Sequence, residues 1–154
     1  MGEPASGRPS PPTLPPPPRP VGSYLPVVQV GNLAWVSGQI PLHEGNPVSP
    51  GLVDSEVDVP HAQAAARQAA LQGLSALVDT LGGLDRIQKV VRVTVYVASS
   101  PGFVRQHEVA NGATGVLLEL LGEPGRPSRA AVGVSRLPMN ASVEVDLLVA
   151  LRSQ

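Results

Sequence analysis

The chain has 154 residues, of which 42% are apolar and only 3% aromatic, and its formal net charge is −1. This length suits one domain with a single core, and the near-zero charge argues against a broad electrostatic surface for nucleic acid or an anionic membrane. The absence of cysteine excludes disulfides, thiol nucleophiles and zinc–thiolate sites. With no signal-peptide pattern and no apolar run of roughly 20 residues, we expect a soluble cytoplasmic protein.

Residues 1–20 form a proline-rich leader. Half of the 18 prolines lie here, including the run Pro15–Pro18. Prolines lack backbone donors and the segment has almost no apolar surface to bury, so it should be extended or disordered and project from the domain. It is either a docking site for a proline-binding module or a tail without a role. We place the folded domain at residues 21–154.

The domain is predicted to begin with two strands and a helix. Apolar residues 27–30 and 33–36 flank Gly31-Asn32, a pair that tolerates the positive φ of hairpin turns. Asp58 then caps a helix whose apolar residues recur at helical spacing. Gly82-Gly83 is a typical end for that helix.

The second half is predicted to hold a long strand, a helix and two more strands. Residues 87–98 alternate as a strand, and Pro101 is expected to start a helix that Gly122 closes. Residues 129–134 and 142–151 are expected to be strands joined by a hairpin. The order ββ–α–β–α–ββ predicts an α+β domain with one sheet and both helices on one face.

Alternation along the strands predicts a second sheet face that is half polar. It directs Val91 toward the helices, together with the other odd-numbered valines of that strand. It also directs Ala130 inward, which leaves Arg129 on the polar face. The other side chains expected there are those of Arg92, Thr94, Tyr96, Ser142, Glu144 and Asp146. Such a face often serves assembly, so we expect a homo-oligomer with sites near the subunit seams.

Arg129 and Glu144 are the two candidates for chemistry on this face. The planar guanidinium of Arg129 suits a carboxylate ligand, although a salt bridge to Glu144 or Asp146 would explain it equally well. Glu144 lies among apolar residues, and partial burial would raise its pKa and allow general acid or base catalysis. The alternative for Glu144 is a solvated strand carboxylate.

Other catalytic patterns are missing from the sequence. The three histidines lack metal-ligand spacing, Ser37 is not in a nucleophile elbow, and no phosphate-binding glycine pattern is present. We therefore expect no metal and no cofactor.

Several short segments, in the same order along the chain, resemble signatures of the RidA/YjgF family. They are Gly22-Ser23-Tyr24, Gly31-Asn32-Leu33, residues 36–41, residues 90–97, residues 128–132, Arg136-Leu137-Pro138 and Val143-Glu144-Val145. The resemblance runs from about Val21 to Leu151. It implies a chorismate-mutase-like (bacillus type) fold with a mixed sheet, and a homotrimer with clefts at the subunit interfaces.

The resemblance also implies hydrolysis of reactive enamine/imine intermediates, such as 2-aminoacrylate, to 2-oxo acids and ammonia. By position, Arg129 matches the arginine that holds the substrate carboxylate, and Glu144 matches the carboxylate that positions or activates water. The remaining matches to the substrate site are Tyr24, Ser37, Gly38, Asn111 and Ala131. Departures around Asn111 indicate a divergent branch, so the alternative is a non-catalytic trimeric module that binds small carboxylates. The near-neutral charge argues against ribonuclease activity.

Overall fold

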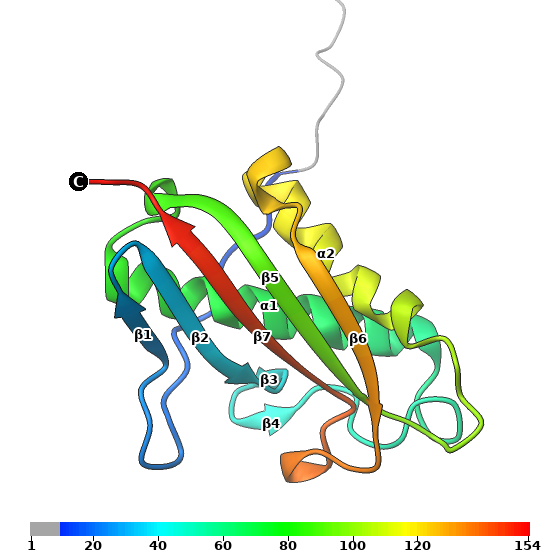
Figure 1. Ribbon diagram of the computed structural model, residues 1–154. Helices are drawn as coiled ribbons and strands as arrows, with labels where there is room; N and C mark the ends of the chain where they lie inside the picture. Colours follow the sequence, from blue (N-terminus) through cyan, green and yellow to red (C-terminus); the bar gives the residue numbers. More distant parts are fainter. Residues whose placement is uncertain (1–9) are drawn as a thin grey trace, which may run out of the picture.

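A mixed five-stranded sheet carries two helices on one of its faces in the computed structural model, which describes residues 10–154 (Figure 1). The elements are β1 (Val27–Val30), β2 (Leu33–Gln39), β3 (Leu42–His43), β4 (Asn46–Pro47), α1 (Val59–Leu81), β5 (Ile87–Ala98), α2 (Gln106–Leu121), β6 (Ser128–Val134) and β7 (Val143–Leu151). The sheet order is β1-β2-β7-β5-β6, and β3 and β4 form a separate two-stranded ribbon. This α+β arrangement confirms the predicted fold class.

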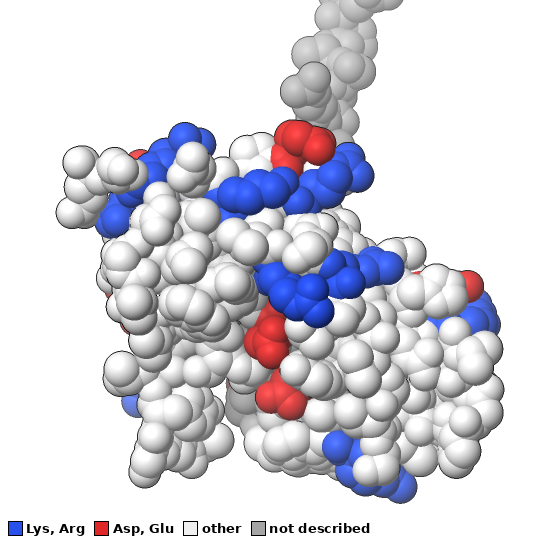
Figure 2. Space-filling view, viewed as in Figure 1, with Lys and Arg blue, Asp and Glu red and all other residues white. Residues whose placement is uncertain are grey.

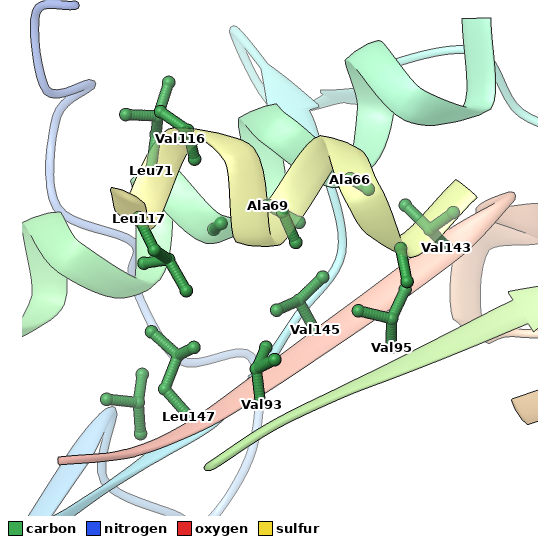
Figure 3. Close-up of a cluster of buried hydrophobic side chains, with 14 of the residues drawn as sticks. Ala66, Ala69, Leu71, Val93, Val95, Val116, Leu117, Val143, Val145 and Leu147 are labelled. Carbon is green, nitrogen blue, oxygen red and sulfur yellow. The ribbon is translucent and has the colours of Figure 1, made fainter. Parts of the chain in front are cut away.

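Valine, leucine and alanine side chains fill the space between the sheet and the helices. The strands direct branched side chains inward, while α1 presents alanines that let its backbone lie close to the sheet (Figure 3). The buried residues labelled there are Ala66, Ala69, Leu71, Val93, Val95, Val116, Leu117, Val143, Val145 and Leu147. Close packing of such aliphatic groups, rather than aromatic rings, therefore stabilises the domain.

The ends of α1 follow the local signals in the sequence. Asp58 accepts a hydrogen bond from the backbone N–H of His61 at 2.8 Å, as an N-cap should. Gly82 ends the helix with a φ of 102°, a conformation that costs other residues free energy. Both predicted boundaries are confirmed.

The predicted hairpin between the last two strands is wrong. β7 lies between β2 and β5 and is antiparallel to both, whereas β6 pairs with the other edge of β5 and is parallel to it. The chain therefore passes the end of β5 between β6 and β7. The short 3-10 helix Pro138–Asn140 makes this passage, and Met139 and Asn140 both adopt positive φ in it.

The parallel register of β5 and β6 corrects the predicted facing of Arg129. Arg129 is the register partner of Val93, which is buried on the helix side. Directly paired residues point to the same face of a sheet, so Arg129 faces α2 and not the polar face that bears Glu144. Ala131 points the same way, whereas Ala130, predicted to be inward, lies on the outer face.

The facing of Val91 and the start of the second helix also differ from the predictions. A bulge between Val90 and Arg92 turns Val91 outward, where its side chain is 36% exposed instead of facing the helices. Helix α2 begins at Gln106 and not near Pro101, because the preceding turn is fixed by the buried Phe103, whose N–H donates to the carbonyl of Ser100 at 3.0 Å.

Part of the leader packs on the domain. Leu14 contacts the core, and the Ser75 hydroxyl of α1 donates a 2.6 Å hydrogen bond to the carbonyl of Pro15. In Figure 1 this blue segment crosses behind the sheet, next to α1. The prediction that the leader projects is therefore wrong for Leu14 and Pro15. Residues 1–9 lie outside the described part of the chain, and the domain boundary at residue 21 stays a prediction.

Candidate functional site

Arg129 lies at the edge of the sheet, where β6 meets α2. Its Nη1 donates to Asn111 Oδ1 at 2.7 Å and to Thr114 Oγ1 at 3.3 Å. Asn111 and Thr114 are three residues apart and so lie on one side of α2. Both hydrogen bonds use the same nitrogen of an exposed side chain. The guanidinium is thus oriented by the helix while its other donors are available to a ligand.

Gly112 sets how deeply α2 lies against α1. A Cβ at this position would meet the backbone carbonyl oxygen of Gln63, so no larger residue fits without moving a helix. The Gln63 side chain also donates to the carbonyl of Glu108 at 2.8 Å. This close crossing fixes the height of Asn111 beside Arg129. The close approach of the two helices therefore explains why a glycine follows Asn111.

Glu144 lies on the outer, polar face of the sheet, directly opposite Tyr96 of β5. Figure 2 shows acidic side chains in a short column on this face, below a basic group. Burial, and to a lesser extent the charge of Asp146, raises the pKa of Glu144 above its ordinary value. Tyr96 donates to Asp146 Oδ2 at 3.3 Å, and the charge of Asp146 is the main cause that raises the pKa of Tyr96.

The carboxylate of Glu144 crosses the backbone of Gly38. An ideal Cβ on Gly38 would lie 2.3 Å from Glu144 Oε1 and 3.0 Å from its Cδ. A bulge between Val36 and Gln39 of β2 brings Gly38 to this place. Because glycine has no side chain at this position, the Glu144 carboxylate can lie against the backbone.

Ser37, next to Gly38 in β2, bonds to the segment that precedes the chain's first hairpin. The Ser37 hydroxyl donates to the carbonyl of Leu25 at 2.6 Å, and its N–H donates to that of Pro26 at 2.9 Å. Ser37 thus fixes the segment that precedes β1. Tyr24 lies on that segment with its side chain 47% exposed.

The predicted site residues therefore fall into two groups on opposite faces of the sheet. We call the residues near α2 the arginine group; they are Arg129, Asn111 and Ala131. We call the residues on the outer face and its margin the glutamate group; they are Glu144, Gly38, Ser37 and Tyr24. Strand β5 lies between β6 and β7, so the two groups do not meet within one chain. The alternative of a salt bridge from Arg129 to Glu144 or Asp146 is wrong, since its partners are Asn111 and Thr114.

The sequence profile of the endoribonuclease L-PSP family matches residues 16–151, nearly the whole domain. The chain belongs to this family, the RidA/YjgF family. Two curated relatives span most of its length. Protein TCP17 of Trypanosoma cruzi is 44% identical over 135 residues, which cover 87% of this chain and 84% of that protein. The 2-iminobutanoate/2-iminopropanoate deaminase of Dermatophagoides farinae is 30% identical over 135 residues, 87% and 90% of the two chains.

Solved structures of RidA/YjgF relatives share the fold. The protein Atu1372 of Agrobacterium tumefaciens, of unknown function, is 46% identical with a TM-score of 0.82, over 83% of this chain and 82% of that one. Escherichia coli TdcF, solved with bound serine, is 25% identical with a TM-score of 0.59, over 89% and 94%. TdcF therefore binds a small ligand, and the shared fold confirms the predicted chorismate-mutase-like fold for this chain.

Some features of this RidA/YjgF site were not found from the sequence. Thr114 was missed as a partner of Arg129, although its spacing from Asn111 is a helical signal. Within residues 10–154, no three His, Asp or Glu side chains are arranged to hold a metal ion. Across the same residues, no helix is long and apolar enough to cross a membrane.

Proposed function

We propose that this RidA/YjgF protein hydrolyses reactive enamine/imine intermediates, such as 2-aminoacrylate, to 2-oxo acids and ammonia. The observation that carries the proposal is Arg129, an exposed guanidinium that two α2 side chains orient at 2.7 and 3.3 Å. Such a fork suits the carboxylate that every 2-imino acid carries. The relative named 2-iminobutanoate/2-iminopropanoate deaminase supports this choice of substrate.

The reaction needs little beyond positioning and one proton-transfer group. Water adds to the imine carbon, the carbon–nitrogen bond then breaks, and the nitrogen leaves as ammonia while a 2-oxo acid remains. Because the imine carbon is already electrophilic, orienting the substrate carboxylate and the water can supply much of the rate. Glu144 would accept a proton from the water and return it to the departing nitrogen. Its raised pKa brings it closer to the neutral pH at which such a group works best.

Arg129 and Glu144 can act together only if they come from different copies of the chain. They face opposite sides of the sheet and are separated by β5, two strand spacings or roughly 10 Å. We propose that the arginine group of one subunit meets the glutamate group of the next in a homotrimer, with the substrate between them. The outer face also exposes Val28, Trp35 and Val132, which a second copy would cover.

Two inactive variants test both parts of this proposal. The wild type should accelerate ammonia release from 2-iminobutanoate made in situ by an amino-acid oxidase, and Arg129→Ala and Glu144→Gln should each lose that acceleration. When the two variants are co-expressed, mixed assemblies regain seams with an intact arginine on one side and an intact glutamate on the other. Random mixing gives such seams at roughly one quarter of positions. No recovered activity would contradict the shared site, and an active Arg129→Ala would contradict the carboxylate clamp.

The alternative is a non-catalytic module that binds small carboxylates. TdcF with bound serine supports it, because serine carries a carboxylate but no imine. The module predicts that 2-oxobutyrate raises the melting temperature of the wild type and not of Arg129→Ala, while no imine is turned over. Measurable turnover removes this alternative.

A further inference from the structure

A groove adjoins the arginine group on the helix side of the sheet. It has a volume of about 240 Å³, and its lining residues are Asn111, Thr114, Gly115, Leu118, Arg126 and Pro127. Both acceptors of the Arg129 hydrogen bonds are among them. The groove therefore lies next to the proposed carboxylate clamp, and Arg126 is a second arginine, in the groove lining.

Arg126 supplies a positive charge to the groove lining. Arg126 bonds through Nε to Glu123 at 2.9 Å in an exposed pair, which is worth little and leaves its terminal nitrogens free to turn. Lys89 donates to the carbonyl oxygens of Glu123 and Arg126 at 3.1 and 2.6 Å, which fixes this turn and adds a third positive charge. Figure 2 shows basic side chains in a band across the upper part of the molecule, where β5 and β6 begin. Arg126 thus lines the groove itself, while Lys89 and Arg129 each bond to residues of its lining.

The groove also offers an apolar surface. Gly115 has no side chain, Leu118 is 37% exposed, and Pro127 offers only ring carbons. Arg126 and Arg129 are three residues apart, so their Cα atoms are at most about 10 Å from each other, and long side chains can close that distance. A short carbon chain with an anionic group at each end would complement Arg126, Arg129 and the apolar surface near them.

We propose that the groove is a second anion subsite, which selects 2-imino acids that carry a further carboxylate at the end of a short side chain. Arg129 binds the carboxylate next to the imine and Arg126 binds the distal one. The inference rests on the proposed deaminase function and specifies its substrate class. Hydrolysis then yields a 2-oxo dicarboxylic acid and ammonia.

Specificity constants for two imines test the subsite. We would generate 2-iminoglutarate and 2-iminobutanoate in situ and measure kcat/KM for the wild type, Arg126→Ala and Arg126→Glu. The wild type should prefer 2-iminoglutarate. Arg126→Ala should lower that preference about tenfold to a hundredfold, the range for losing a hydrogen bond to a charged group, and Arg126→Glu should lower it further. Activity on 2-iminobutanoate should stay within about threefold.

Arg105→Ala is the matched control. Arg105, like Arg126, is exposed and paired with a glutamate three residues away, but it lies outside the groove. It should leave the preference unchanged. A wild type that turns over 2-iminobutanoate without preferring 2-iminoglutarate, or an Arg126→Ala that slows both equally, would overturn the subsite and leave the deaminase function standing.

If neither imine is hydrolysed, the deaminase function fails and binding still tests the groove. The product 2-oxoglutarate should then raise the melting temperature more than 2-oxobutyrate does, and Arg126→Ala should remove the difference. Equal shifts for the two oxo acids would overturn the subsite.

Discussion

Replacing Gly38 by alanine should lower the activity strongly and change the stability little. The added Cβ would lie 2.3 Å from Glu144 Oε1, whereas ordinary contact begins near 3.4 Å. The carboxylate oxygen must therefore move by about 1.1 Å. Gly38 does not adopt a positive φ, so alanine fits its backbone, and only the end of a flexible side chain has to give.

The expected loss of kcat/KM is about a hundredfold, because misplacing a reacting group by 1 Å can cost that much. This equals ~2.7 kcal/mol of transition-state stabilisation. The free energy of unfolding should change by no more than about 1 kcal/mol. Alanine lowers the conformational entropy of the unfolded chain, and this stabilisation offsets the cost of displacing the carboxylate. The melting temperature should then move by no more than about 4 °C.

A double-mutant cycle with Glu144→Gln decides whether the effect passes through Glu144. In the Glu144→Gln background the acid–base step is already lost, so Gly38→Ala should have little further effect on imine hydrolysis. If the two losses instead multiply, Gly38 acts on the substrate or the fold by itself. That result would refute the reasoning from the Gly38–Glu144 contact.

Three further predictions concern stability. Glu144→Gln should raise the melting temperature near neutral pH. Because the pKa of Glu144 is raised in the folded state, the wild type loses stability as the pH rises through that pKa. The gain from Glu144→Gln should therefore vanish below a pH of about 4.3, where the carboxyl is protonated in the folded and in the unfolded protein. Gly112→Ala should cost about 1–3 kcal/mol in urea unfolding because its Cβ meets the Gln63 carbonyl, and an unchanged midpoint would contradict the tight helix crossing. Ser75→Ala should cost about 1 kcal/mol through the lost bond to Pro15, and no change would show that the leader does not dock in solution.

Features that depend on residues close together in the sequence were predictable from the sequence. Asp58 and Gly82 mark the ends of α1 by their own side-chain and backbone chemistry. The alternation of β7 also held, since every second residue from Val143 to Leu151 is buried. In that strand one face packs on the helices and the other is partly polar, so the pattern is unambiguous.

The facing of Arg129 was not predictable in this way. Both faces of β6 carry small or apolar residues, so alternation offers two registers that differ by one residue. Only the parallel pairing with β5, which lies 30 or more residues earlier in the chain, chooses between them. The prediction that directed Ala130 inward instead placed Arg129 on the same face as Glu144. Arg129 and Glu144 were thus named as candidates from the sequence, but their arrangement required the sheet order.

The packed leader shows a similar limit. Proline-rich composition indicates a segment without secondary structure, and that much agrees with residues 10–20. It does not indicate whether another surface accepts such a segment. The Ser75 hydroxyl on α1 provides that contact, 60 residues away in the sequence.

β6 is an edge strand of the sheet, and in a separated subunit its outer edge is unpaired. Its seven residues include one charged side chain and neither proline nor lysine, the residues that usually protect an exposed strand edge. An uncovered edge of this composition favours pairing with the edges of other chains. Disrupting the proposed trimer should therefore yield aggregates instead of free monomers. Assembly would then be a requirement for solubility as well as for completing the site.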